Sequence, residues 1–575
     1  MKLVDISIEN FRGIKKLLLP LDELTILIGE NNTGKSTILE ALKFILTRGL
    51  GTRRSGRFRE YDFHLTDDTA TPQESGEIKI KLHFAELQED EWPDSIVQQL
   101  SEVIQPDMGT GLNHIWLQVE GRFNPDAEIF ETKWDFLNSS DAALVLKNAT
   151  ALHLLQRFVP LFYLSALRDA TQEFGQRGQF WNSFLKSIQL PDDERANLEE
   201  MLQTVNSTVI ESNEGLNQVI QQIANANCLV SLDASDPVIL EAIPTRIFDM
   251  VGKIQVFLKS PLGAKLPLQR YGEGTQSLAV LLLFQAFAEV NLAEAYDQDS
   301  SPILALEEPE AHLHPSAIRT LGQFMKDMSG QKIVSSHSGD LISRVSIHSI
   351  RRLYKEGDET KIGMIHSGVL SDRELQAVDY NIRLTRGAYL FSRCWVLVEG
   401  ESDFHLMPLL GEILGLSQDR ASFSVLEISQ VIDKGEPFIK TAKALGIQWF
   451  MMADGDPAGI DYTNRANNYL ESGELLSDRA VNLPSVDIEH EFWNNGFDNF
   501  IKNMVSHSRQ TRISTEAAGD SVKETKLLIK AAIKAAGGKP AFARSLIGEV
   551  NSRGSASIPT VIQNIFARIT QLVGE

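Results

Sequence analysis

The sequence predicts an α/β protein built from two successive α/β units, and three observations lead to that prediction. A glycine-rich loop at residues 29–36 (GENNTGKS) follows an apolar strand and precedes a helix. Apolar segments that end in carboxylates recur downstream, at residues 302–308, 394–399 and 447–456. The intervening residues 166–235 are polar and have helical periodicity. Strands alternating with helices in this way are typical of sheets with a parallel core.

The composition indicates a globular chain of several domains. It has 575 residues, of which 43% are hydrophobic and 23% charged, as in soluble proteins. No apolar run approaches the roughly 20 residues that span a bilayer, and the longest, residues 278–290, is expected to be a buried helix. The N-terminus alternates like a strand rather than a signal peptide. Cys228 and Cys394 form no disulfide or zinc pattern, so we expect a cytoplasmic protein without membrane contact.

The net charge of −22 is unevenly distributed along the chain. Residues 501–575 carry 11 Lys+Arg against 5 Asp+Glu, whereas the first 500 residues carry a net −28. Lys526, Lys530 and Lys534 recur at a spacing of four and are expected on one helix face. That face either contacts phosphate or is simply solvated, and the pattern leaves both readings open. A second basic run follows the glycine loop and comprises Arg48, Arg53, Arg54, Arg57 and Arg59.

The glycine-rich loop is predicted to bind the phosphates of ATP. An apolar strand at residues 24–28 enters it and a helix at residues 37–43 leaves it, which is the context that a phosphate loop requires. Backbone N–H groups of the loop and the helix start would cradle the phosphates. Lys35 would reach the β- and γ-phosphates, and Ser36 would ligate Mg²⁺. The predicted residues are Gly29, Asn32, Gly34, Lys35, Ser36 and Thr37.

Three downstream segments are expected to complete this site. A strand at residues 302–306 ends in Glu307 and Glu308; the first would hold Mg²⁺ through water and the second would polarise the attacking water. A further strand ends in His337. Residues 271–277 (YGEGTQS) open a long apolar helix, and a glycine-rich helix start is an anion-binding feature.

In this order the segments resemble the ABC-type ATPase heads of SMC and RecF proteins, over about residues 1–90 and 240–345. The resemblance implies that Gly274 and Gln276 belong to the signature motif, which binds ATP held by a second head, and that His337 is the switch histidine. It therefore implies paired heads.

The sequence departs from that family in two places. Glu307 stands where most heads have Asp, and the signature reads GEGTQ instead of LSGGQ. These departures put fast hydrolysis in doubt but not nucleotide binding. His312 and His314 could be read as a metal pair, although they fall where such heads have their D-loop.

The polar stretch at residues 170–225 carries helical patterns such as Leu198, Met201, Leu202 and Val205. It is expected to be a helical insertion in the head. A dimerising arm and a subdomain packed on its own head are both compatible with this pattern.

The second unit is expected to hold divalent metal. A buried strand at residues 394–398 ends at Glu399, with Asp403 about one helical turn further on. A second buried strand is followed by Asp454 and Asp456. Because ligand residues gather at the carboxyl ends of parallel strands, these side chains should converge. Oxygen ligands favour Mg²⁺ or Mn²⁺ over zinc. Either Asp487 or Glu489, in a third acidic segment, could complete a second metal position.

These residues resemble the Toprim domain, over about residues 390–500. A cassette head followed by Toprim resembles the OLD-family endonucleases, which include the GajA type. That resemblance implies a metal-dependent nuclease that nicks or cuts duplex DNA, is controlled by ATP, forms dimers or larger homo-oligomers and acts in defence against phage. Lys539 falls where this family often has a catalytic lysine. The sequence leaves open whether a separate helicase-like partner protein is required.

The predicted domains are residues 1–165 and 236–380 for the head, 166–235 for its insertion, 381–500 for Toprim and 501–575 for a basic helical part. The alternative function is a RecF/SMC-type DNA-binding ATPase clamp with an inert Toprim module. A primase would need a zinc-binding domain, which two scattered cysteines cannot build. A type II topoisomerase would need a tyrosine-bearing cleavage domain, for which the last 75 residues leave little room.

Overall fold

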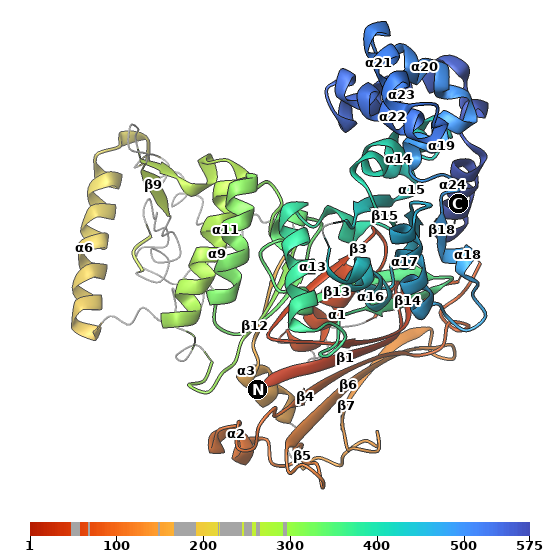
Figure 1. Ribbon diagram of the computed structural model, residues 1–575. Coiled ribbons are helices and arrows are strands. Elements are labelled where there is room, and N and C mark those ends of the chain that lie inside the picture. Colours follow the sequence, from red (N-terminus) through yellow and green to blue (C-terminus); the bar gives the residue numbers. More distant parts are fainter. Residues whose placement is uncertain are drawn as a thin grey trace.

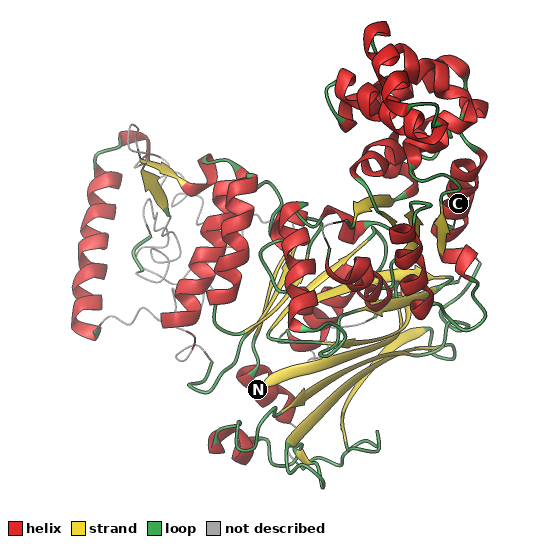
Figure 2. Cartoon of the chain, viewed as in Figure 1, coloured by secondary structure: helices red, strands yellow, loops and turns green. Residues whose placement is uncertain are grey.

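The computed structural model shows an antiparallel β lobe, a mixed α/β head and a smaller parallel α/β unit capped by helices (Figures 1 and 2). It describes residues 1–47, 58–66, 69–147, 150–165, 191–216, 218, 244–246, 256–259, 265–290, 292, 296–429 and 431–574. The described residues do not include Arg48, Arg53, Arg54, Arg57 or Cys228. Most of the predicted insertion, and parts of the predicted domains at its borders, also lie outside them.

The β lobe lies at the bottom of Figure 1. Its strands are β1 (Lys2–Phe11), β2 (Ile14–Pro20), β4 (Ile78–Ala85), β5 (Gln105–Pro106), β6 (Asn113–Asn124) and β7 (Ile129–Leu137). They run in the order β2-β1-β4-β6-β5, with β7 also pairing with β6. Alternation with period two explains the lobe, since Ile6 and Ile8 are buried while Ser7 between them is partly exposed.

The head sheet has the order β14-β13-β3-β12-β11-β8 and is parallel except for β14. Its strands are β3 (Leu24–Gly29), β8 (Leu161–Leu164), β11 (Ile303–Glu307), β12 (Gln331–Ser335), β13 (Ile350–Glu356) and β14 (Glu359–Gly363). The helices are α1 (Lys35–Leu46), α2 (Asp94–Gln99), α3 (Ala151–Phe158), α9 (Glu273–Val290), α11 (Pro315–Asp327), α12 (Gly339–Ile342) and α13 (Asp372–Leu384). A short pair of strands, β9 (Phe257–Lys259) and β10 (Lys265–Pro267), precedes α9.

The sequence made predictions about two helical segments of the head, residues 278–290 and the insertion. The helix expected to be buried, α9, buries Leu281 and Phe284, but Leu282 is 56% exposed, so it is buried on one face only. Gln285 and Glu289 interrupt its apolar run, and only one face meets the core. Of the predicted insertion, helix α6 (Asp192–Glu211) is described. Its apolar residues Met201 and Val205 are exposed, and α6 lies at the left edge of Figure 1.

The second unit is a parallel sheet of order β16-β15-β17-β18. Its strands are β15 (Cys394–Val398), β16 (Phe423–Glu427), β17 (Gln448–Ala453) and β18 (Ala480–Asn482). Helices α14 (Glu401–Ile413), α15 (Gln418–Ala421), α16 (Glu436–Leu445), α17 (Pro457–Ala466), α18 (Leu476–Arg479) and α19 (Ile488–Phe492) accompany the sheet. The top of Figure 1 holds α20 (Asp498–Asn503), α21 (His507–Ala517), α22 (Ser521–Ala536) and α23 (Lys539–Arg553), while α24 (Thr560–Val573) returns along the sheet.

The predicted fold class is confirmed, with the phosphate-loop head preceding the Toprim-type sheet. The two units are not loosely tethered, because one continuous apolar core contains Ile28 of the head together with Trp395 and Phe438 of the second unit. Buried Arg352 of β13 also donates to the carbonyls of Leu445 (3.3 Å), Gly446 (3.0 Å) and Ser392 (3.0 Å). The head is therefore joined to the second unit by packing and by buried hydrogen bonds.

Candidate functional site

The phosphate loop connects β3 to α1, as predicted. Gly29 and Gly34 have φ values of 144° and 100°, and a Cβ on Gly29 would lie 2.2 Å from the carbonyl oxygen of Leu353. Glycine is therefore required at that turn. The Lys35 Nζ donates to the carbonyls of Gly29 (2.9 Å) and Glu30 (2.7 Å). Burial lowers the pKa of Lys35 to about 8, so a phosphate in this loop would meet a partly desolvated ammonium.

The predicted magnesium residues of the head lie next to each other. The Ser36 hydroxyl makes a short hydrogen bond to Glu307 Oε1, although β11 is far away in the sequence. Tyr163, at the neighbouring strand β8, donates to Glu307 Oε2 at 2.9 Å. Burial, followed by the charge of Glu307, raises the pKa of Tyr163, so its hydroxyl remains a donor. Tyr163 was not predicted, because nothing in its strand distinguishes it from a core tyrosine.

Glu308 and His337 also meet, with 3.7 Å between Glu308 Oε1 and His337 Nε2. Burial and then the charge of Lys35 lower the pKa of His337, which keeps the imidazole neutral at pH 7. Glu310 was not predicted. It accepts from the Ser336 hydroxyl (2.7 Å) and the His337 amide (2.8 Å), and so fixes the backbone that carries the histidine. Its second oxygen is buried without a hydrogen-bond partner.

The signature segment begins α9. A Cβ on Gly274 would lie 2.6 Å from the carbonyl oxygen of His312, so a side chain there would displace that loop. Gln276 Nε2 donates to the carbonyl of Tyr271 at 2.7 Å. Within the described residues, no hydrogen bond of Gln276 reaches the phosphate loop of its own chain, and its ATP contact stays a prediction.

The two histidines read as a metal pair are engaged separately. His312 lies 2.9 Å from Glu273, whereas His314 caps α11 and contacts Ser316. The metal-pair reading is therefore not supported by their arrangement.

The acidic residues of the second unit lie at the carboxyl ends of its strands. Glu399 follows β15 and Asp454 follows the adjacent strand β17, and the Asp454 amide donates to Glu399 Oε2 at 3.2 Å. Asp403 caps α14 by accepting from the Gly400 amide at 3.0 Å. Its other oxygen, Oδ1, is buried and has no hydrogen-bond partner. Asp456 caps α17 by accepting from the Gly459 amide at 2.8 Å.

A hydrogen bond from Ser402, the neighbour of Asp403, joins α14 to the third acidic segment. Ser402 donates to Glu489 Oε1 at 2.5 Å, which connects α14 to α19. Asp487 caps α19 and contacts both the amide (2.8 Å) and the Nδ1 (2.6 Å) of His490. That contact raises the pKa of His490 and so favours an imidazolium beside Asp487.

The electrostatics of this acidic cluster suit a bound cation. Burial, together with the surrounding carboxylates, raises the pKa of Asp454 to about 8 and that of Asp403 to about 7. Glu399 and Glu489 are raised as well, mainly by burial. Lys539, the first residue of α23, counteracts the shifts of Asp403 and Glu489, so its ammonium lies nearby. Crowded, partly buried carboxylates of this kind are destabilised by their own charge unless a cation joins them.

A divalent metal fits this donor set on two grounds, namely the orphaned Asp403 Oδ1 and the accumulation of oxygen donors. As the side chains stand, however, no three His, Cys, Asp or Glu residues in the described ranges form a metal-binding group. Asp403, Asp456 and Asp487 serve as helix caps here. The ligand assignment therefore stays a prediction.

Three further residues beside the cluster were not predicted. Glu427 ends the edge strand β16, paired with Val398 of β15, and accepts from Ser429 at 2.6 Å. Its segment, an apolar strand followed by an acid, could have revealed it. Lys434 Nζ lies 4.4 Å from the ring centre of Tyr462. No local sequence pattern distinguishes Lys434 or Tyr462 from other residues of their type.

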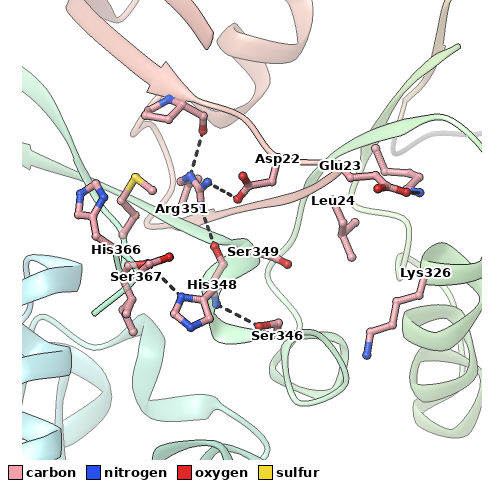
Figure 3. Close-up of a pocket in the computed structure, with 14 residues that line it drawn as sticks. Asp22, Glu23, Leu24, Lys326, Ser346, His348, Ser349, Arg351, His366 and Ser367 are labelled. Atoms are coloured by element: carbon pink, nitrogen blue, oxygen red, sulfur yellow. Dashed lines mark hydrogen bonds and ion pairs between the residues drawn. The ribbon is translucent and has the colours of Figure 1, made fainter. Parts of the chain in front are cut away.

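A cavity of about 600 Å³ lies away from both sites, near the start of β3 and β12 (Figure 3). Figure 3 shows Arg351 at its wall, donating to the carbonyls of Pro20 (3.0 Å) and His348 (2.7 Å) and to Asp22 (2.6 Å). Buried Lys332 donates to the Met328 carbonyl at 2.8 Å. The two buried cations at this cavity are therefore engaged by the chain itself.

Two family models match successive parts of the chain. Residues 1–388 match a family model described as "Protein of unknown function (DUF2813)". Residues 390–456 match "Overcoming lysogenization defect protein-like, TOPRIM domain". Among the described helices, none has the length and apolarity to cross a membrane.

Three relatives are similar to this chain, each with 25% identity or less over the matched residues. The uncharacterized protein YbjD of Escherichia coli (strain K12) is 25% identical over 100% of this chain and 99% of its own length. The Old nuclease of Escherichia phage P2 is 24% identical over 85% of this chain and 82% of its own. The Endonuclease GajA of Bacillus cereus (strain VD045) is 21% identical over 70% and 66%, respectively.

Two solved structures give more distant matches. An Smc head domain derived from Pyrococcus furiosus matches with 14% identity and a TM-score of 0.38, over 66% of this chain and 99% of that one. The C-terminal region of the Burkholderia pseudomallei OLD protein matches with 24% identity and a TM-score of 0.27, over 32% and 99%.

Proposed function

The chain belongs to the DUF2813 family and carries an OLD-like Toprim domain, and from this premise we propose that it is a metal-dependent DNA endonuclease controlled by ATP. The substrate is duplex DNA, which the enzyme nicks or cuts. Two relatives of this chain are named as an Old nuclease and an endonuclease, which supports the proposal. A role in defence against phage, and a homodimer or larger assembly, rest on the resemblance to the OLD family.

The observation that carries the proposal is the acidic cluster with a lysine beside it. Glu399 and Asp454 lie at adjoining strand ends and Asp403 lies in the first turn of α14, and all three have raised pKa values. Such a cluster destabilises the fold by itself, and clustered, perturbed groups are a feature of functional sites. Lys539 supplies positive charge at its edge.

The proposed ligands are Glu399, Asp403, Asp454, Asp456 and either Asp487 or Glu489. These side chains would hold two divalent metal ions, which when bound would supply an activated water and stabilise the leaving oxygen. The chain's own residues orient the ligands, since Ser402 holds Glu489 and His490 holds Asp487. Lys539 would bind the scissile phosphate and stabilise the charge that develops on it.

In the head, ATP would bind the loop through Gly29, Asn32, Gly34, Lys35, Ser36 and Thr37, with Glu307 holding Mg²⁺. Glu308 and His337 would act on the attacking water. Gly274 and Gln276 would reach ATP in a second head. The Tyr163–Glu307 and Glu310–His337 contacts support this assignment because they hold the relevant groups in place.

The route for ATP control begins at Glu30 within the phosphate loop. Its carboxylate is paired with both Arg393 Nε and Arg393 Nη2, the latter at 2.8 Å. The Arg393 guanidinium lowers the pKa of Glu30. Arg393 directly precedes β15, and β15 ends at Glu399. A bound phosphate would draw Lys35 away from the Glu30 carbonyl and so shift Glu30. Because Glu30 is paired with Arg393, that shift would pull on β15, the strand that ends at Glu399.

Incubation of the purified protein with supercoiled plasmid tests this function. The wild type should nick or linearise DNA with Mg²⁺ or Mn²⁺ and lose activity in EDTA. Asp454→Asn should lower the rate at least about 100-fold, because a metal ligand is lost. Lys326→Gln, an exposed head lysine, serves as the matched control and should cut normally. DNA-stimulated ATP hydrolysis without any cutting would instead favour a DNA-binding ATPase clamp.

A further inference from the structure

The acidic cluster is bordered by positive charge on two sides, and the second side is Lys434. Lys539 acts on Asp403 and Glu489. Lys434 acts on the other end, where its ammonium counteracts the burial that raises the pKa of Glu399. It belongs to a short turn, Ile432–Gly435, between the edge strand β16 and helix α16.

The backbone of this turn is strained. Asp433, Lys434 and Gly435 have φ values of 50°, 54° and 80°, so three successive residues are left-handed. For a non-glycine residue this conformation is unfavourable, because Cβ crowds the following carbonyl oxygen. Gly435 packs against Ile428 so closely that a Cβ would lie 2.7 Å from its Cδ1. The packed surroundings hold the turn in place, and strain of this kind is found where a side chain is positioned for function.

The turn delivers the Lys434 ammonium to a defined place. Its Nζ lies 4.4 Å from the ring centre of Tyr462, a cation–π distance. Tyr462 is 4% exposed and belongs to α17, the helix that Asp456 caps. The turn itself contacts α17, and it follows β16, whose last residue, Glu427, pairs with Val398 directly before Glu399.

Lys434 has no ion pair within 4.0 Å among the described residues, unlike the lysines of the adjoining helix α16, Lys440 and Lys443. Its charge is therefore held in place and still available to an anion.

We propose that Lys434 binds the DNA phosphate next to the scissile one, on the Glu399 side of the cluster, and that Tyr462 holds its ammonium in position. This inference rests on the proposed endonuclease function. Lys434 is a positioning residue here, and with Lys539 it would place the DNA backbone across the carboxylates from both sides.

The test is the salt dependence of DNA binding, measured by fluorescence anisotropy with a labelled duplex in Ca²⁺, on an Asp454→Asn background that prevents cutting. Each phosphate contact contributes about 0.9 to the slope of log Kd against log salt. Lys434→Gln should reduce that slope by about one and weaken binding about tenfold at low salt. Lys434→Arg should retain both, and Lys326→Gln should leave both unchanged.

The variant Lys434→Gly distinguishes a loss of DNA binding from a loss of folding stability. Glycine adopts the left-handed conformation without strain, so this variant should melt no lower than the wild type while showing the same reduced slope. In the cutting-competent protein, Lys434→Gln should raise KM about tenfold with kcat within about twofold.

An unchanged slope and KM in Lys434→Gln and Lys434→Gly would overturn the inference while leaving the nuclease intact. Failure of the wild type to cut, with a slope that still depends on Lys434, would overturn the proposed function but retain the DNA contact.

Discussion

At the scale of residues, the carboxylates of the second unit have two incompatible roles. Asp403, Asp456 and Asp487 cap helices, which requires ionised or at least accepting oxygens. Asp403 and Asp454 are nevertheless crowded enough that their pKa values lie near 7 and 8. The folded chain therefore binds protons that the unfolded chain would release at neutral pH. A cation replaces those protons, so metal binding and protonation compete for the same oxygens.

This competition predicts a stabilising mutation. The pKa of Asp454 is raised from 3.8 to about 8 on folding. A carboxylate whose pKa is raised on folding lowers the free energy of unfolding as the pH rises from 3.8 towards 8. Below pH 3.8 the carboxylate is protonated in both states and this destabilisation disappears. Without metal, Asp454→Asn should raise the free energy of unfolding at pH 8 by about 1–2 kcal/mol, measured by urea denaturation in EDTA.

The gain should shrink steadily from pH 8 to pH 4. Added Mg²⁺ should stabilise the wild type more than the variant, because the variant lacks the charged ligand. An Asp454→Asn protein that is less stable than wild type at pH 8 in EDTA would contradict this account.

At the scale of elements, local patterns predicted the pieces whose chemistry is local. The phosphate loop and the strands that end in Glu307, Glu399 and Asp454 follow from apolar runs closed by polar residues. The left-handed turn at Lys434 could not be foreseen, since it is fixed by the packing of Gly435 on Ile428.

Contacts between distant segments were equally hidden. Nothing near Glu30 indicates that it pairs with Arg393, 363 residues away. Tyr163 and Glu310 likewise became recognisable only once folding placed them beside Glu307 and His337.

Helix α6 makes a prediction at this scale about assembly. Leu198, Met201, Val205 and Val209 recur at spacings of three and four, and all are at least 38% exposed. An apolar stripe of this length is unusual on a monomer's helix. If α6 is the dimerising arm, Met201→Glu/Val205→Glu should lower the mass measured by light scattering to that of a smaller species. Glu199→Lys, on the same helix, serves as the control and should leave the mass unchanged.

At the scale of the whole molecule, the two candidate sites belong to units that are packed against each other. The head and the Toprim-type sheet share an apolar core, and Arg352 adds three buried hydrogen bonds between them. A change in the phosphate loop therefore has a mechanical path to β15. Coupling through such a path is a free energy and must be measured as one.

A double-mutant cycle on Glu30 and Arg393 measures that coupling. The wild-type cutting rate should change when ATP is added, and Glu30→Gln should reduce that change at least fivefold while ATP still binds, because Lys35 and the glycines remain. Arg393→Gln should have the same effect, and the double variant should be no worse than either single one, since one ion pair is removed in each case.

Nucleotide affinity, followed with a fluorescent ATP analogue, distinguishes lost coupling from lost binding. Arg465→Gln, which removes a surface ion pair with Glu436 within the second unit, should keep the full ATP response. Additive effects of the two single variants would show that ATP reaches the acidic cluster by another route.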